Sequence, residues 1–551
     1  MAIASKIAAL RTVATDCHIA AWSFSDVQAA EVFAVADGLR ARFLPPPAAG
    51  SSAVQQLPLL WLQLLPTELL SVVLSHLDTH DLARLAATCR PLWRDAPAPP
   101  PRPMPLLRPM GPVETELRRR ATARGLRIDP SLPAGALSWV PYLLRCVLRD
   151  ALRRQAPIAV GRGCSLFVDP ERRLLTCGND SVEGEHVLGH DWGADIDPDA
   201  LHAIGPPTLV PSMEGRRIVS VATGGEHCLA LSTEGEVYSW GGGAYGSLGH
   251  ADGGARVVPS RIESLSQIES IAAGTGLTSA AVDEVGRLFT WGQAKYVYAP
   301  TMPNGLGYAL DSQAEFQLTP KWVDALSQDC VVGVTLGNGF TLAVTGAGAV
   351  FSFGYSDQGA LGHGSLEAEV LPRRIEALAQ TGRRFVTVAA GGDHALALTE
   401  EGELYGWGHA CANGHGREEP TPHRVAALIG ERVKLVHAQD DASCAVTESG
   451  ELFTWSEDGS LYNLGHGVDT PQDTPKRVEG VGGARIAAVA IGGYHTLAVD
   501  EDGVVWAFGR RSGLGLYDPN PEDDAFVKTP TSIPTLRVRA RKSPDVLPFR
   551  W

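Results

Sequence analysis

Residues 155–538 alternate between short apolar runs and glycine-rich turns, and the alternation keeps a repeating order. An apolar run is followed by Gly-Gly-x-His, a run of small and apolar residues, an acidic-Gly turn and a third run ending in aromatic-Gly. The clearest copies contain His227, His394 and His495. Short apolar runs bounded by glycines predict β-strands joined by tight turns.

Seven copies of this unit can be located from the pair of residues that ends its third strand. These pairs are Cys177-Gly178, Trp240-Gly241, Trp291-Gly292, Phe353-Gly354, Trp407-Gly408, Trp455-Ser456 and Phe508-Gly509, spaced by 63, 51, 62, 54, 48 and 53 residues. A four-stranded unit of this length cannot bury both of its faces alone. Seven units stacked around an axis bury one another, so the sequence predicts a mostly β fold, a seven-bladed β-propeller over residues 155–538.

The recurring histidines, tryptophans and glycines occur once per unit and would lie far apart around a ring. We therefore predict structural roles for them, such as hydrogen bonds that hold turns and positive φ angles that favour glycine. The residues assigned to this role are Gly225, His227, Trp240, Gly241, Gly392, His394, Trp407, Gly408, Gly493 and His495. No metal site, cofactor or catalytic residue is predicted.

The part before the repeats has a different character. Residues 1–54 form an N-terminal extension, and residues 55–96 have a helical apolar pattern. Residues 97–112 contain eight prolines, which predicts a stiff extended linker. Residues 113–154 read as a helical connector, and residues 539–551 as a basic tail.

The helical pattern in residues 65–95 places leucines on one apolar stripe that is too large for two or three short helices to bury alone. The run Leu-Pro-x-Glu-Leu-Leu, followed by Asp-Leu, Cys-Arg and a Trp, resembles the F-box family. The resemblance implies binding to a Skp-type adaptor in a cullin ubiquitin ligase. The residues that would contact the adaptor are Leu65, Pro66, Leu69, Leu70, Leu74, Leu77, Leu82 and Leu85. The alternative is a helical hairpin that packs on residues 113–154.

The repeats themselves resemble the regulator of chromosome condensation family, on the strength of the Gly-Gly-x-His and aromatic-Gly elements quoted above. The resemblance implies a seven-bladed propeller. It does not by itself imply nucleotide exchange on a small GTPase, because propellers serve many functions. An F-box-like segment, a linker and a propeller together predict a substrate-recognition subunit of a Skp-cullin-F-box ubiquitin ligase, and a GTPase exchange factor or regulator is the alternative. A light-sensing role known in the same repeat family is disfavoured, because no Trp precedes the repeat histidines.

The charge distribution and the cysteine content indicate which classes of partner and which cellular compartment suit the protein. Residues 1–154 hold 18 Lys+Arg and 12 Asp+Glu, and residues 155–551 hold 29 and 50, so their net charges are +6 and −21. A net charge of −21 disfavours binding to nucleic acid or to anionic membranes and suits a protein partner. The nine cysteines contain no CxxC pair, which favours reduced thiols in the cytoplasm or nucleus. The substrate itself cannot be identified from the sequence.

Two motifs resemble known binding sites in residue spacing but lack the other features that those sites require. Gly241-x-Gly243-x-x-Gly246 has the spacing of a dinucleotide fingerprint but belongs to the repeat, and no helix follows it. The acidic run Asp195-x-Asp197-x-Asp199 lacks the glycine and the bidentate acid of a calcium loop. The connections 179–206 and 293–320 are the longest irregular stretches of the propeller, and we predict that they carry substrate specificity.

Overall fold

The structure of the protein is a computed structural model. It describes residues 157–179, 186–191, 203–293, 295–296, 299–303, 305–310, 314–457, 462–514 and 526–538. The predicted segments 1–54, 55–96, 97–112, 113–154 and 539–551, including all eight predicted adaptor-binding residues, lie outside the described residues.

Seven four-stranded antiparallel sheets follow one another along the described chain, and we number them as blades 1–7. Blade 1 contains β1 (Ile158–Val160), β2 (Cys164–Val168), β3 (Leu174–Asn179) and β4 (Ala203–Leu209). Blade 2 contains β5 (Ile218–Thr223), β6 (His227–Ser232), β7 (Val237–Gly241) and β8 (Arg256–Arg261). Blade 3 contains β9 (Ile268–Ala273), β10 (Thr278–Asp283), β11 (Leu288–Gln293) and β14 (Phe316–Trp322). A two-stranded sheet of β12 (Lys295–Tyr296) and β13 (Ala299–Pro303) lies between β11 and β14 in the chain.

The remaining blades have the same strand order. Blade 4 contains β15 (Val331–Leu336), β16 (Phe340–Thr345), β17 (Val350–Gly354) and β18 (Glu369–Arg374). Blade 5 contains β19 (Phe385–Ala390), β20 (His394–Thr399), β21 (Leu404–Gly408) and β22 (Glu419–Arg424). Blade 6 contains β23 (Val433–Gln439), β24 (Ala442–Thr447), β25 (Leu452–Ser456) and β26 (Gln472–Arg477). Blade 7 contains β27 (Ile486–Ile491), β28 (His495–Asp500), β29 (Val504–Arg510) and β30 (Phe526–Arg537).

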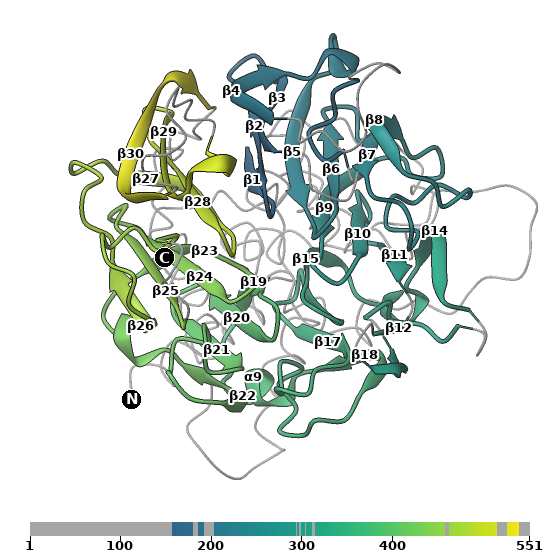
Figure 1. The fold of residues 1–551 in the computed structure, drawn as a ribbon. Coiled ribbons are helices and arrows are strands. Elements are labelled where there is room, and N and C mark those ends of the chain that lie inside the picture. Colours follow the sequence, from purple (N-terminus) through teal and green to yellow (C-terminus); the bar gives the residue numbers. More distant parts are fainter. Residues whose placement is uncertain are drawn as a thin grey trace, which may run out of the picture. The chain divides into compact units, whose positions relative to one another are not determined.

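The blades stand around a common axis, as Figure 1 shows. The first strand of each blade contacts the first strands of both neighbouring blades, including β1 with β27, so the ring is closed and these strands line the axis. Blades 1 and 7 each consist of consecutive strands. The two ends of the ring are therefore joined by side chains and loops instead of a shared sheet. This arrangement confirms the predicted mostly β, seven-bladed propeller.

Seven apolar clusters form the core, one between each pair of neighbouring blades. The second strand of every blade is buried along its whole length because it faces a neighbouring blade on each side. In β6, for example, Ala230 packs toward blade 1 and Leu229 and Leu231 pack toward blade 3. Burial on both faces explains why these runs read as continuous apolar sequence without alternation.

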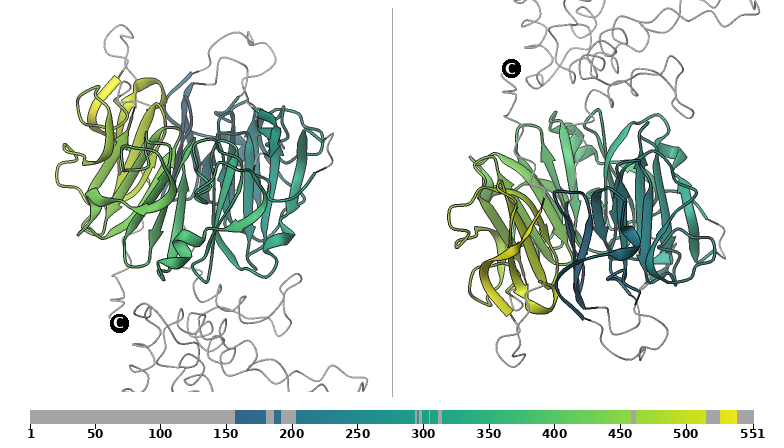
Figure 2. Two further views of the ribbon diagram at one scale, coloured as in Figure 1. Left: turned by 90° about the horizontal axis from the view of Figure 1, so that it is seen from below. Right: turned by 90° about the horizontal axis from the view of Figure 1, so that it is seen from above.

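Each blade presents turns at the two ends of the ring, which Figure 2 shows edge on. We call face A the end that carries the turn between the first and second strands and the connection after the third strand. Face B carries the acidic-Gly turns, such as the one containing Glu401 and Gly402. The helical elements that the structure describes are short: α9 (Glu376–Gln380) and the 3₁₀ turns η1 (Pro211–Met213), η2 (Asp324–Leu326), η3 (Ala426–Leu428) and η4 (Arg511–Gly513). Within the described part of the chain, no helix has the length and apolar character needed to cross a membrane.

Candidate functional site

The histidines of the Gly-Gly-x-His elements lie at the start of the second strands, and each reaches across to the next blade. His227 Nε2 lies 2.7 Å from Ser279 Oγ, and His394 Nε2 lies 2.6 Å from Ser443 Oγ. His495 Nε2 lies 2.8 Å from the hydroxyl of Ser165 in blade 1. All three imidazoles are fully buried. The histidines are therefore parts of three separate contacts between blades, and the structure does not bring them together.

The tautomers of His227 and His495 follow from the hydrogen bonds of their serine partners. Ser279 Oγ donates to the carbonyl of Ser247, and Ser165 Oγ donates to the carbonyl of Gly513. Each of these hydroxyls must therefore accept its second hydrogen bond from the Nε2–H of a histidine. Burial lowers the pKa of His227 to about 4 and that of His495 to about 3, so both rings are neutral at physiological pH. Their Nδ1 atoms are buried and have no hydrogen-bond partner among the described residues.

The tryptophans of the aromatic-Gly pairs also hold neighbouring blades together. Trp240 Nε1 donates to the Val187 carbonyl at 2.8 Å, and Trp407 Nε1 donates to the Ala360 carbonyl at 2.7 Å. Gly241 and Gly408, which follow them, have φ angles of 106° and 91°. These angles lie in the region that favours glycine, where a Cβ would be strained.

The glycines that precede the histidines contact a turn of a neighbouring blade. A Cβ added to Gly225 would lie 3.0 Å from the Thr275 carbonyl oxygen. A Cβ added to Gly392 would lie 3.4 Å from the Asp440 carbonyl oxygen, and Gly392 N donates to that oxygen at 2.6 Å. A Cβ added to Gly493 would lie 2.9 Å from Asp440 Oδ2. These three glycines permit close packing of neighbouring turns at face A.

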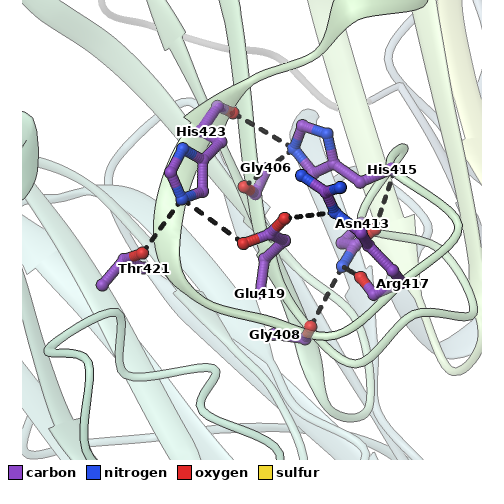
Figure 3. Close-up of polar contacts among 8 residues, drawn as sticks. All are labelled: Gly406, Gly408, Asn413, His415, Arg417, Glu419, Thr421 and His423. Carbon is purple, nitrogen blue, oxygen red and sulfur yellow. Dashed lines mark hydrogen bonds and ion pairs between the residues drawn. The ribbon is translucent and has the colours of Figure 1, made fainter.

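Blade 5 departs from the others in the turn after its third strand, and Figure 3 shows the result. In blade 4 the hydroxyl of Ser352 donates to the Leu361 carbonyl and contacts His363 Nε2 at 2.9 Å. Blade 5 has Gly406 in place of this serine and Asn413 in place of the leucine. Asn413 Nδ2 donates to the carbonyls of Gly408 and Arg417, its Oδ1 accepts from His415 N, and His415 Nε2 lies 3.2 Å from the Gly406 carbonyl.

Face A holds a cluster of chemically active side chains between blades 5 and 6, and it is our candidate functional site. His409 and Cys411 follow β21, Asp393 precedes β20, Asp441 precedes β24 and Glu457 follows β25. One possible ligand atom each from His409, Cys411 and Glu457 lie within 4.8 Å of one another. Cys411 Sγ lies 3.8 Å from Asp441 Oδ1. The arrangement combines a nitrogen, a sulfur and carboxylate oxygens at one point of the ring.

Burial and neighbouring carboxylates raise the pKa values of two groups in this cluster. Burial, with the charges of Asp357 and Asp441, raises the pKa of Asp393 to about 6. Burial, with the charges of Asp441, Glu457 and Asp393, raises the pKa of Cys411 far above its ordinary value. Asp393 Oδ1 is buried without a hydrogen-bond partner among the described residues. Burial of a carboxylate oxygen without a hydrogen-bond partner is costly.

The repeat pattern itself contains a signal for this cluster. Asp393 and Asp441 are both last residues of the turns that precede second strands. His409 and Glu457 are equivalent too, because each follows the pair that ends a third strand. Equivalent turns of neighbouring blades are adjacent once the ring closes, so marking the polar residues at these two positions would have shown the convergence.

Each connection predicted to carry specificity begins where a third strand ends at face A. The first joins β3 to β4, and the second joins β11 to β14 and includes β12 and β13. Most of the first connection lies outside the described residues. Their role in specificity stays a prediction.

Models of two known protein families match parts of this chain. Two models of the regulator of chromosome condensation (RCC1) repeat match the chain, one at residues 234–281, 347–398 and 449–499 and the other at residues 218–247, 385–417 and 486–513. An F-box-like model matches residues 62–96. The chain carries RCC1 repeats and an F-box-like segment. Both predicted resemblances are confirmed.

Parts of this chain are similar in sequence to known proteins. The E3 ubiquitin-protein ligase HERC2 of Homo sapiens is 36% identical over 330 residues, which are 59% of this chain and 6% of HERC2. The ultraviolet-B receptor UVR8 of Arabidopsis thaliana is 35% identical over 244 residues, 42% of this chain and 52% of the receptor. This chain therefore covers only a small part of HERC2 and about half of UVR8.

Solved structures show the same fold. Yeast RCC1 (Prp20) bound to Kap60 superposes with a TM-score of 0.56 at 21% identity, covering 74% of this chain and 89% of that chain. Human WBSCR16 superposes with a TM-score of 0.54 at 18% identity, covering 66% of this chain and 93% of that chain. Together, the RCC1 propeller and the F-box-like segment support an adaptor role related to ubiquitin ligation.

Proposed function

We propose that the protein is the substrate-recognition subunit of a Skp-cullin-F-box ubiquitin ligase. The observation that carries this proposal is the presence of an F-box-like match at residues 62–96 and a closed RCC1 propeller in one chain. In the proposed role the F-box-like segment binds the Skp-type adaptor and the propeller binds the target protein. Other subunits of the complex transfer ubiquitin.

The propeller has the properties of a binding platform. Its blades are held by seven inter-blade cores and by hydrogen bonds such as those of His227 and Trp240, so the face A turns stand on a rigid support. The net charge of −21 over residues 155–551 favours a target with a basic surface, because complementary charge speeds encounter and selects partners.

Binding of the full-length chain to a purified Skp-type adaptor tests the proposal. The double variant Leu69→Asp/Leu74→Asp places two carboxylates on the predicted contact surface and should abolish capture of the adaptor. Leu57→Asp lies outside residues 62–96 and serves as the matched control, which should bind like the wild type. If the wild-type chain does not bind the adaptor, the proposal is wrong.

A second candidate function is guanine-nucleotide exchange or regulation of a small GTPase. The support for this function is the shared fold. A solved structure with this fold is that of Prp20p from Saccharomyces cerevisiae, whose binding to Gsp1p and histones was studied with it. That protein is 22% identical to this chain, with a TM-score of 0.55. Release of labelled nucleotide from a panel of small GTPases is the test. Acceleration by the full-length chain that persists in Leu69→Asp/Leu74→Asp would favour this function over the receptor role.

A further inference from the structure

The cluster between blades 5 and 6 has the composition of a metal site. His409 supplies an imidazole, Cys411 a thiol and Glu457 a carboxylate, and their ligand atoms lie within 4.8 Å of one another. Asp441 adds a second carboxylate at 3.8 Å from Cys411 Sγ. Two of these residues come from blade 5 and two from blade 6, so an ion bound by them would join the blades.

We propose that His409, Cys411, Asp441 and Glu457 bind a divalent transition-metal ion of the zinc class at face A. Zinc takes four ligands in a tetrahedral arrangement and accepts thiolate sulfur, imidazole nitrogen and carboxylate oxygen. Calcium and magnesium take oxygen ligands, so a thiol and an imidazole argue against them. The site is independent of the ligase role, since it depends only on residues of the propeller.

The charge at the cluster calls for a cation. None of Asp357, Asp393, Asp441 and Glu457 forms an ion pair with a lysine or arginine within the part of the chain that the structure describes. Asp393 Oδ1 is buried there without a hydrogen-bond partner. A divalent ion beside these groups offsets the repulsion among the carboxylates and stabilises the thiolate form of Cys411.

The neighbouring polar cluster of blade 5 shows the contrast (Figure 3). Glu419 Oε1 accepts from Arg417 Nε at 2.6 Å, and Glu419 Oε2 lies 3.3 Å from His423 Nε2. His423 Nε2 also lies 3.1 Å from Thr421 Oγ1. Both oxygens of this carboxylate have protein partners, so this cluster gives no reason to expect a bound ion.

A basic side chain from a partner protein is a weaker explanation for the cluster. Cys411 is 2% exposed, and its thiol would gain nothing from a lysine or arginine held at the surface. A metal ion explains the sulfur, the imidazole and the carboxylates together.

The test is Co²⁺ titration of the full-length, metal-stripped protein, followed by displacement with Zn²⁺. The wild type should bind Co²⁺ with a thiolate-to-cobalt charge-transfer band, and Zn²⁺ should remove that band. Cys411→Ser should lose the band, and Glu457→Gln, an exposed position, should weaken binding of Zn²⁺ by about tenfold or more. Both variants should keep the near-ultraviolet circular dichroism of the folded wild type.

Cys228→Ser is the matched control, because serine occupies the equivalent buried position in blades 1, 3 and 6 at Ser165, Ser279 and Ser443. It should retain the band and the wild-type affinity for Zn²⁺. If the wild type gives no charge-transfer band, or if folded Cys411→Ser gives the same band, the proposal is overturned. Retained adaptor binding in Cys411→Ser would separate the fate of this site from that of the ligase role.

Discussion

The imidazole of His495 in blade 7 and the hydroxyl of Ser165 in blade 1 meet at 2.8 Å although 330 residues separate them in the chain. Ser165 also donates to the carbonyl of Gly513, so one serine links two elements of the last blade to the first. Blades 1 and 7 share no strand among the described residues, so this contact and the apolar cluster around it close the ring.

Ser165→Ala should weaken ring closure. The substitution leaves the buried Nε2–H of His495 without an acceptor, which costs about 1–3 kcal/mol of unfolding free energy. Ser279→Ala breaks the equivalent contact between blades 2 and 3 and is the matched control. Hydrogen exchange should accelerate in β1, β2, β27 and β28 for Ser165→Ala, and in β6 and β10 for the control. Equal protection of β1 and β27 in both variants would contradict a special role in closure.

The buried histidines should make the propeller sensitive to acid. Burial lowers the pKa of His394 to about 3, whereas a histidine in the unfolded chain titrates near 6.5. Between these values the unfolded state binds more protons, so stability is fully present above pH 6.5 and falls as the pH decreases. At pH 5 each such histidine costs about 2 kcal/mol.

The variant His394→Gln tests this titration, because glutamine can still donate to Ser443 but does not titrate. It should be less stable than the wild type at pH 7.5 and should lose about 2 kcal/mol less between pH 7.5 and 5, as measured by urea denaturation. An unaltered pH dependence in His394→Gln would show that this ring does not drive acid destabilisation.

Replacement of Trp407 separates its hydrogen bond from its volume. Phenylalanine stands naturally at the equivalent positions 353 and 508, so Trp407→Phe should fold. It loses the donor to the Ala360 carbonyl and should cost about 1–3 kcal/mol, whereas Trp407→Ala should cost about 3–5 kcal/mol through its cavity. Denaturant midpoints of the two variants check this order. A phenylalanine variant as unstable as the alanine variant would assign the whole effect to the hydrogen bond.

The sequence allowed the propeller to be predicted because its repeat has both a period and a fixed order of strand and turn residues. His227 and Trp240 recur for local packing reasons, and local repetition is visible in one dimension. The contact between His495 and Ser165 was not predicted, because it depends on which blade follows which around a closed ring. The cluster of His409, Cys411 and Glu457 was missed for the same reason, since its members are ordinary residues until two neighbouring blades bring them together.

Gly406 and Asn413 of blade 5 stand where blade 4 has a serine and a leucine. They allow a test of energetic coupling between two positions of one repeat. A Cβ on Gly406 would collide with the carbonyl oxygen of Asn413, so Gly406→Ser alone should be destabilising. Asn413→Leu alone removes the side-chain bonds to the carbonyls of Gly408 and Arg417 and should also destabilise the protein. Together the two substitutions rebuild the serine–leucine arrangement that blade 4 uses at Ser352 and Leu361.

The double variant Gly406→Ser/Asn413→Leu should therefore lose less unfolding free energy than the sum of the two single variants, by about 0.5–3 kcal/mol. Combining Gly406→Ser with Trp291→Phe in blade 3 gives the reference, because distant sites that share no partner add within about 0.5 kcal/mol. Equilibrium denaturation of the three single variants and the two double variants measures both differences. Strict additivity in blade 5 would mean that Gly406 and Asn413 were exchanged independently, and that the turn after each third strand tolerates either residue without regard to the other.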